Sequence, residues 1–340
     1  MKLILAAGAL LTALAAITRY TSGVSHVLAF VVATLALAAL AYVVSFATEQ
    51  TGRRYGPGAT GLLQATIGNL PEFFVVIFAL GVGARTVAQT AILGSILVNA
   101  LLVLGLVIIA GALKAHDGIM RFSPRLPNDT ATLLLVSSFI IILVGLTHGR
   151  HGKVISIVGA CVILLVYATW LRQYLMSDQL PEEDETGTLL STPYAVALLA
   201  LAGTASAFVS DWFVHALQPT IKTVHISQAF AGLVIVAIAG KAVENITGIV
   251  LAAKGKSELA ISVVKNSVGQ IAAFLYPLLV LVSLLTATTL TFSLAPVYIG
   301  ALLGTAVIVW QITGDGEATL FEGVALIAAY VILATVASFE

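Results

Sequence analysis

The chain has 340 residues, of which 59% are hydrophobic and only 9% carry a charge. A soluble domain could not bury so many apolar side chains, so the composition indicates a polytopic membrane protein that partners the lipid bilayer. The formal net charge is zero and the basic residues are dispersed, which argues against a nucleic-acid partner. The single cysteine, Cys161, excludes an internal disulfide.

Eleven apolar segments, each long enough to cross a bilayer as a helix, follow one another along the chain. The first resembles a signal peptide, but other spans follow it, and we interpret it as a retained transmembrane helix. The predicted spans are residues 2–18, 26–47, 57–82, 86–112, 129–147, 152–175, 192–216, 228–253, 257–286, 294–311 and 318–338.

These spans divide into an N-terminal helix and two sets of five. We place the helix and its loop at residues 1–25, the two sets at 26–176 and 192–340, and an acidic linker at 177–191. Because a set of five ends on the opposite side of the membrane, the second set enters inverted relative to the first. The predicted fold is all-α: a polytopic protein of about 11 transmembrane helices, with one N-terminal helix and two inverted repeats.

The Lys and Arg residues of the loops predict the orientation. Nine lie on the side of the N-terminus and five on the other, if successive spans alternate in direction. Cytoplasmic loops are the richer in Lys and Arg, so we expect a cell-membrane protein with a cytoplasmic N-terminus and an external C-terminus. The acidic run at residues 181–185 is then cytoplasmic; it is typical of a solvated linker, with a regulatory calcium site as the alternative.

Two glutamates lie at matching places inside apolar spans of the two halves. Glu72 and Glu244 are 172 residues apart, and the same offset maps Ser95 onto Ser267 in the next span. A carboxylate near the bilayer centre costs roughly 2.5 to 3.5 kcal/mol or more, so it is rarely present without a function. Inverted repeats bring equivalent residues together near the midplane, and the pair therefore indicates an ion site.

Oxygen donors surround the first of these glutamates. Asn69 precedes Glu72 by three residues and shares its helical face, and Pro71 is expected to free a backbone carbonyl one turn earlier. Carboxylate, amide and carbonyl oxygens are the ligands that Ca²⁺ prefers. We therefore predict that Glu72 and Glu244 bind the metal ion.

The spans that follow carry further polar side chains. Ser95 and Asn99 are four residues apart, and Ser267 and Gln270 three, so each pair can face one point. We include all four in the predicted cation and proton site. The alternative is that they form ordinary interhelical hydrogen bonds.

Around these residues the chain resembles the calcium/proton antiporters of the calcium/cation antiporter superfamily, over nearly its whole length. That family carries a Gly-Asn-x-x-Glu element in each half, then a helix with Gly-Ser and either Asn or Gln. The first half matches from Gln64 to Glu72 and at Gly94, Ser95 and Asn99. In the second half the segment from Ser227 to Gly240 is similar to the lead-in of the second element.

The resemblance implies an eleven-helix fold and exchange of cytoplasmic calcium for external protons. It also implies that Glu72 and Glu244 are shared ligands of calcium and protons. No cofactor is implied, because Ca²⁺ or another cation is the transported substrate and H⁺ the coupling ion. The partners are thus an inorganic cation, protons and lipid, and a homo-oligomer is compatible with the sequence.

The second element departs from the family pattern. Lys241 replaces its Asn, and Asn266 with Ser267, preceded by Lys265, replaces its Gly-Ser pair. If Lys241 and Glu244 both face inward they can form an ion pair, and an ammonium there opposes calcium binding. Three interpretations stay open: Lys241 is a built-in cation that alters selectivity, it loses its proton during transport, or it points away and pairs elsewhere. Lys265 is expected to face away from Ser267.

The predicted function is a secondary cation/proton antiporter that exports Ca²⁺ by alternating access. The main alternative is a divergent antiporter in which Lys241 has changed selectivity toward a monovalent or other cation. An intramembrane enzyme is disfavoured because no nucleophile and base are paired in the sequence. A channel could share the acidic lining but would not couple cation flux to protons.

Overall fold

The computed structural model describes residues 2–52, 63, 67–146, 151–176 and 190–340. The side chains of residues 2–4, 145–146, 174–175 and 242–244 lie outside that description. Gln64 and the acidic linker through residue 189 are therefore outside the described residues, and so is the side chain of Glu244, although its backbone is helical.

Helices make up almost all of the described chain, and η1, η2 and η3 are π-helical. The first half contains α1 (Lys2–Tyr20), α2 (His26–Gly52), α4 (Leu70–Gly81), α5 (Arg85–Leu97), η1 (Val98–Val103), α6 (Leu104–Lys114), β1 (Ile119–Arg121), α7 (Arg125–Leu146) and α8 (Gly152–Leu175). The second half contains α9 (Thr192–Val224), α10 (Gln228–Phe230), η2 (Ala231–Val236), α11 (Ala237–Ala253), α12 (Ser257–Gln270), η3 (Ile271–Leu275), α13 (Tyr276–Val282), η4 (Ser283–Leu285), α14 (Pro296–Thr313), β2 (Glu317–Thr319) and α15 (Leu320–Ser338).

The predicted all-α polytopic fold is confirmed. Within the described residues eight helices are long and apolar enough to span a membrane, and a ninth span is bent by 61° between Gln228–Lys241 and Asn245–Ala253. Two shorter apolar helices, Leu5–Tyr20 and Leu70–Gly81, overlap the first and third predicted spans, and most of residues 57–66 of the third is outside the described residues. Such long helices form because the lipid interior offers no partners for backbone N–H and C=O groups.

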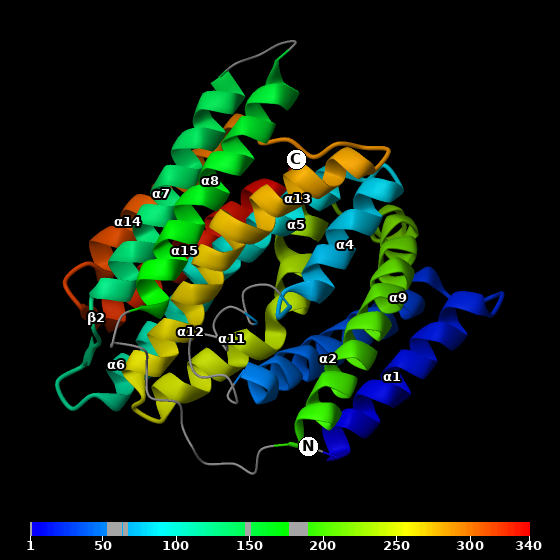
Figure 1. Cartoon of the computed structure of the whole chain (residues 1–340), viewed down its shortest axis with the longest axis horizontal. Coiled ribbons are helices and arrows are strands. Elements are labelled where there is room, and N and C mark those ends of the chain that lie inside the picture. Colours follow the sequence, from blue (N-terminus) through cyan, green and yellow to red (C-terminus); the bar gives the residue numbers. More distant parts are fainter. Residues whose placement is uncertain (1, 53–62, 64–66, 147–150, 177–189) are drawn as a thin grey trace.

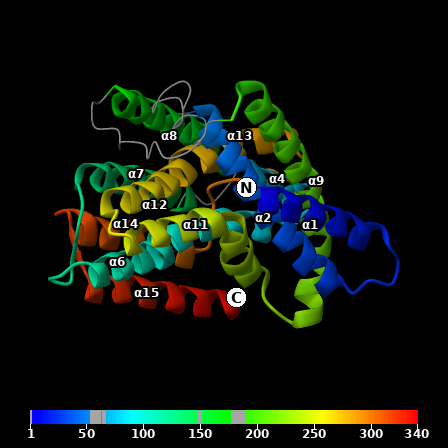
Figure 2. The same cartoon turned by 90° about the horizontal axis from the view of Figure 1, so that it is seen from below.

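The offset of 172 residues that relates the glutamates also relates whole helices of the two halves. It maps α2 onto α9, α5 with α6 onto α12 with α13, and α7 onto α14. Two of these pairs pack against each other, α2 on α9 and α7 on α14. Figures 1 and 2 show α1, α2 and α9 along one side of the molecule and α7 and α14 along the other.

The spans differ in how deeply they lie within the protein. The central windows of Arg85–Lys114 and Ser257–Leu285 are 83% and 67% buried, against 28% for Thr192–Val224. The first two spans carry the predicted Ser95, Asn99, Ser267 and Gln270. The polar positions are thus on the helices most protected from lipid, where a polar group can find protein partners.

The two halves touch backbone to backbone where α5 crosses η2. A Cβ atom at Gly94 would lie 2.6 Å from Leu233 Cα, and one at Gly232 would lie 2.8 Å from the Val87 carbonyl oxygen. Only glycine fits at such a distance, as in other close helix crossings within membranes. This contact fixes a helix of the first half against the second site element.

A short antiparallel ribbon joins the halves at one end of the molecule. Strand β1 pairs with β2, with Met120 opposite Ala318. Arg121 bridges Asp117 at 2.7 Å and Glu317 at 3.1 Å. The hydrogen bond from the Arg121 guanidinium holds the pKa of the exposed Asp117 carboxyl below its ordinary value.

Candidate cation site

The first site element is a break in the third predicted span. Residues 67–69 form a turn, and α4 begins at Leu70 with Asn69 at its N-cap position. Glu72 lies in the first turn of α4 and is 5% exposed, while Asn69 is 2% exposed. The partial positive charge of a helix N-terminus favours a carboxylate there, so the break itself stabilises the ionised Glu72.

The expected role of Pro71 is wrong. A proline inside a helix removes a backbone hydrogen bond, but α4 starts just before Pro71, where a missing N–H is not needed. The carbonyl one turn earlier, that of Ile67, accepts a hydrogen bond from Leu70 N at 3.1 Å. Proline therefore marks the beginning of the half-helix and does not supply a free carbonyl.

The second site element lies in the bent span of the second half. Lys241 is 3% exposed and stands just before the bend, and Asn245 follows it at 8% exposure. The Asn245 side-chain oxygen is buried without a hydrogen-bond partner among the described residues. Glu244 occupies α11 between them, with its side chain outside the described part of the structure.

The two elements meet through side chains at equivalent positions. The Lys241 ammonium donates a hydrogen bond to Asn69 Oδ1, and these residues are 172 positions apart. Lys241 Nζ also lies 3.8 Å from Glu72 Oε2. Of the three interpretations of Lys241, the one in which it points away is therefore wrong, and the described ion-pair partner is Glu72 of the other half.

The remaining predicted ligands lie on the two buried spans of α5 and α12, which pack against α4 and α11 respectively. The Asn99 side-chain nitrogen donates to the Ser95 carbonyl at 2.7 Å, where α5 passes into η1. Ser267 and Gln270 lie at the end of α12, immediately before η3. All four are buried, with exposed fractions of 2% for Ser95, 1% for Asn99, 4% for Ser267 and 8% for Gln270.

The π-helical segments η1 and η3 occupy equivalent places in the two repeats. Shifting η1 (Val98–Val103) by 172 residues gives residues 270–275, which contain all of η3 (Ile271–Leu275). A π segment shifts the hydrogen-bond ladder and often accompanies a functional site. Each segment begins beside the predicted polar pair of its own half, and no sequence signal in the apolar runs indicated it.

Lys265 faces away from the candidate site, as expected. Its side chain is 1% exposed, and its ammonium donates to Thr313 Oγ1 of α14 at 3.0 Å. No ion pair joins Lys265 to another residue in the described ranges. It is therefore a buried amine between α12 and α14 and takes no part in the described contact between the two site elements.

Helix α9 forms a hydrogen bond to the first site element that the sequence did not predict. Ser210, which is completely buried, donates to the Pro71 carbonyl at 3.3 Å. The bond attaches the first turn of α4 to the second half. A polar pair four residues apart in an apolar helix, Ser206 and Ser210, was the available signal.

Histidine, cysteine and acidic side chains alone do not form a metal centre in the part of the chain that the structure describes. A cation at this place would need amide, hydroxyl or carbonyl oxygens in addition to carboxylates. Buried groups of the first two kinds are present at Asn69, Ser95 and Asn99. Such mixed oxygen donors fit a hard cation such as Ca²⁺.

Comparisons with known proteins identify the family of this chain. The sequence profile of the sodium/calcium exchanger protein family matches residues 25–173 and 194–339. The vacuolar calcium ion transporter of Schizosaccharomyces pombe is 31% identical, over 89% of this chain and 77% of that protein. The Ca²⁺/H⁺ antiporter ChaA of Bacillus subtilis is 29% identical, over 98% of this chain and 97% of its own.

A solved structure extends the similarity to three dimensions. Native YfkE superimposes with a TM-score of 0.82 at 28% identity, covering 99% of each chain. The fold, the two matches of one profile and the paired buried elements agree with one another. The chain belongs to the sodium/calcium exchanger protein family.

Proposed function

We propose that this protein is a secondary antiporter that exports Ca²⁺ from the cytoplasm in exchange for H⁺. The observation that carries the proposal is the buried meeting of the two site elements, with Glu72 and Asn69 at the start of a half-helix. The names of the yeast and Bacillus relatives, a calcium ion transporter and a Ca²⁺/H⁺ antiporter, support the substrate and the coupling ion.

The mechanism follows from the charge of the two glutamates. Ionised Glu72 and Glu244 bind the cation together with oxygens of Asn69, Ser95, Asn99, Ser267 and Gln270. Protonation removes the negative charges and releases the cation, so an inward proton gradient drives export. The two halves rock about the central helices and expose the site to each side in turn. The excess of Lys and Arg in the N-terminal-side loops supports a cytoplasmic N-terminus and an external C-terminus.

Lys241 changes the charge of this site. Two carboxylates balance one Ca²⁺, whereas two carboxylates and an ammonium leave a net charge of minus one. At roughly 4 Å and an effective dielectric near 20, two unit charges interact by about 4 kcal/mol. The Lys241 ammonium, 3.8 Å from Glu72 Oε2, therefore competes with an incoming cation for the same carboxylate. For Ca²⁺ to bind, the ammonium either moves aside or loses its proton.

The same contact favours a second candidate function. If Lys241 keeps both its place and its charge, the site suits a monovalent cation better than Ca²⁺. The protein would then exchange sodium, potassium or an organic cation for protons. The two candidates differ in the fate of one ammonium group, and a transport assay separates them.

The test is uptake driven by a pH gradient in proteoliposomes, with radioactive calcium, sodium and rubidium offered separately. The native protein is compared with Glu72→Gln and Lys241→Asn. Glu258→Gln is the matched control, because Glu258 also lies in the first turn of its helix but is exposed. We expect calcium uptake by the native protein and by Glu258→Gln, and none above background by Glu72→Gln.

The other outcomes discriminate between the candidates. Sodium or rubidium uptake by the native protein, with calcium uptake only in Lys241→Asn, would establish the monovalent function and reject calcium export. Calcium flux that persists after the pH gradient is collapsed, with no proton movement, would indicate a channel. Equal uptake by native protein and Glu72→Gln would reject the site itself.

A further inference from the structure

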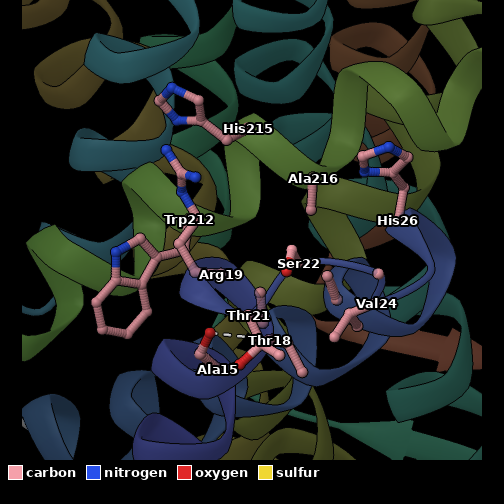
Figure 3. A pocket seen from close by; sticks show the side chains of 13 residues that line it. Ala15, Thr18, Arg19, Thr21, Ser22, Val24, His26, Trp212, His215 and Ala216 are labelled. Carbon is pink, nitrogen blue, oxygen red and sulfur yellow. Dashed lines mark hydrogen bonds between the residues drawn. The ribbon is translucent and has the colours of Figure 1, made fainter.

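A polar groove of about 280 Å³ lies on the surface where the end of α1, the α1–α2 loop and α9 meet (Figure 3). None of the candidate cation ligands lines it. The groove is therefore a separate feature of the molecule, and its chemistry is independent of cation exchange.

The groove is lined by groups that bind anions. Figure 3 shows Arg19 and His215 on one side and His26 on the other, with the hydroxyl groups of Thr21 and Ser22 in the loop. No aspartate or glutamate is among the lining residues. A guanidinium, imidazole groups and hydroxyl donors together suit a ligand with several acceptor oxygens and a negative charge.

Among the described residues no carboxylate forms an ion pair with Arg19. Its guanidinium lies 5.7 Å from the ring centre of Tyr20. Asp211, the acidic group next to the groove, is held by His215 of the same helix at 3.2 Å. Arg19 therefore remains available to an external anion.

The position of the groove relates it to the membrane surface. It lies at the loop that joins two apolar helices, and such a loop reaches the headgroup region. The rings of Tyr20 and Trp212 meet edge to face at 6.1 Å, and these two residue types concentrate at the headgroup level. On the same two helices as Tyr20 and Trp212, the side chains of Ile17 and Phe208 are each 58% exposed and can contact acyl chains.

We propose that this groove binds the phosphate of an anionic phospholipid. Arg19 and His215 hold the phosphate, Thr21 and Ser22 donate hydrogen bonds to its oxygens, and an acyl chain runs along Ile17 and Phe208. Basic pockets beside transmembrane helices recognise lipid headgroups in this way. Free phosphate shares the headgroup chemistry, but it makes no use of the exposed apolar side chains of Ile17 and Phe208 on α1 and α9.

The experiment measures thermal unfolding of the delipidated full chain in neutral detergent at low salt. Phosphatidylglycerol, phosphatidylcholine and inorganic phosphate are added separately to the native protein, to Arg19→Gln and to Arg172→Gln. Arg172 is the matched control, because it is an exposed arginine in the last turn of its own helix, as Arg19 is. Unfolding without added lipid shows that each variant is folded.

We expect phosphatidylglycerol to raise the Tm of the native protein and of Arg172→Gln by several degrees more than phosphatidylcholine does. Arg19→Gln should lose at least half of that difference, and native mass spectrometry should show fewer retained phosphatidylglycerol molecules. Equal shifts with the two lipids, or an undiminished shift in Arg19→Gln, would overturn the proposal. A full shift with inorganic phosphate alone would assign the groove to a soluble anion and overturn the lipid assignment.

Discussion

The two site elements share a backbone plan but differ in charge. At three pairs of positions related by the offset of 172, the first half carries Asn69, Leu93 and Gly94 where the second carries Lys241, Lys265 and Asn266. Both halves retain a glutamate, a broken or bent helix and a π segment beside it. The two halves have thus kept the same backbone features at the site, while several of the side chains at equivalent positions differ in charge.

Exchanging the residues at the contact between the halves should produce the largest effect. Lys241→Asn removes an ammonium close to Glu72, and we expect the KM for calcium to fall at least tenfold. The double variant Asn69→Lys with Lys241→Asn places an ammonium back at the contact from the other half. Its KM should return toward the native value in the proteoliposome assay.

One result for the double variant would contradict this prediction. If the double variant keeps the low KM of Lys241→Asn, the position of the lysine matters and not its charge. The equivalence of the two elements across the contact would then be limited to the backbone.

The second largest effect is expected at the glycine that distinguishes α5 from α12. Gly94→Ala would bring a Cβ atom within 2.6 Å of Leu233 Cα. Overpacking of this kind typically costs about 1 to 3 kcal/mol. The higher helix preference of alanine over glycine offsets about 1 kcal/mol of that cost at most. We expect a lower Tm by thermal unfolding in detergent. Gly300→Ala is the control, because nothing lies within 4 Å of its added Cβ; a similar Tm for both would disprove a tight crossing.

Replacing Lys265 by the residue of the first half should stabilise the protein. Lys265→Leu removes a buried polar side chain that has no ion-pair partner in the described residues. Burying such a side chain costs free energy, and the first half avoids this cost by carrying Leu93 at the equivalent position. The Thr313 hydroxyl keeps its bond to the Val309 carbonyl at 2.7 Å, so no polar group is orphaned. We expect a Tm higher by a few degrees and unchanged calcium uptake. Loss of uptake would place Lys265 in the transport machinery after all.

The smallest effect is expected in the ribbon that joins the halves. The folded protein lowers the pKa of Asp117 from its ordinary value of 3.8, so its ionised form contributes stability above that value. That contribution is lost as the pH falls through the lowered pKa. Asp117→Asn should therefore have a slightly lower Tm than the native protein near pH 7, with the difference shrinking in acid.

The control for this variant is Asp315→Asn, an exposed aspartate that forms no ion pair in the described chain. Its Tm should show no such pH-dependent difference from the native protein. A difference of the same size for both variants would mean that the Arg121 bridge contributes nothing specific.

The fold could be predicted because the bilayer imposes it. Each apolar run must form a helix to satisfy its backbone, so the segments themselves located the eight spanning helices and the bent span that the described residues contain. The positions where helices break are set by tertiary contacts, and prediction failed there. The third span is interrupted at residues 67–69, and the seventh predicted span continues as α9 to Val224, beyond residue 216.

Residue type and the internal repeat were the two signals from which residues of the candidate site could be predicted. The shared offset indicated Glu72 as a site residue but left the direction of Lys241 open, and the structure places both side chains in one buried contact. The contact of Lys241 with Glu72 was not predicted, because a sequence shows neighbours on one helix and Glu72 comes from the other half. The bond from Ser210 was missed for the same reason. The predicted pair of Lys241 with Glu244 stays a prediction, since the Glu244 side chain lies outside the described residues. The assignment of Glu72, Glu244, Asn69, Ser95, Asn99, Ser267 and Gln270 as cation ligands stays a prediction.

The glycine crossing between α5 and η2 has a consequence for how this protein could change over time. Because Gly94 and Gly232 let main chain rest on main chain, the crossing of α5 and η2 needs no side chain at either of these two positions. Ligand positions could then be rewritten one at a time without loosening the scaffold. A substitution of asparagine by lysine at position 241 could change the ion preference of the site without preventing the protein from folding.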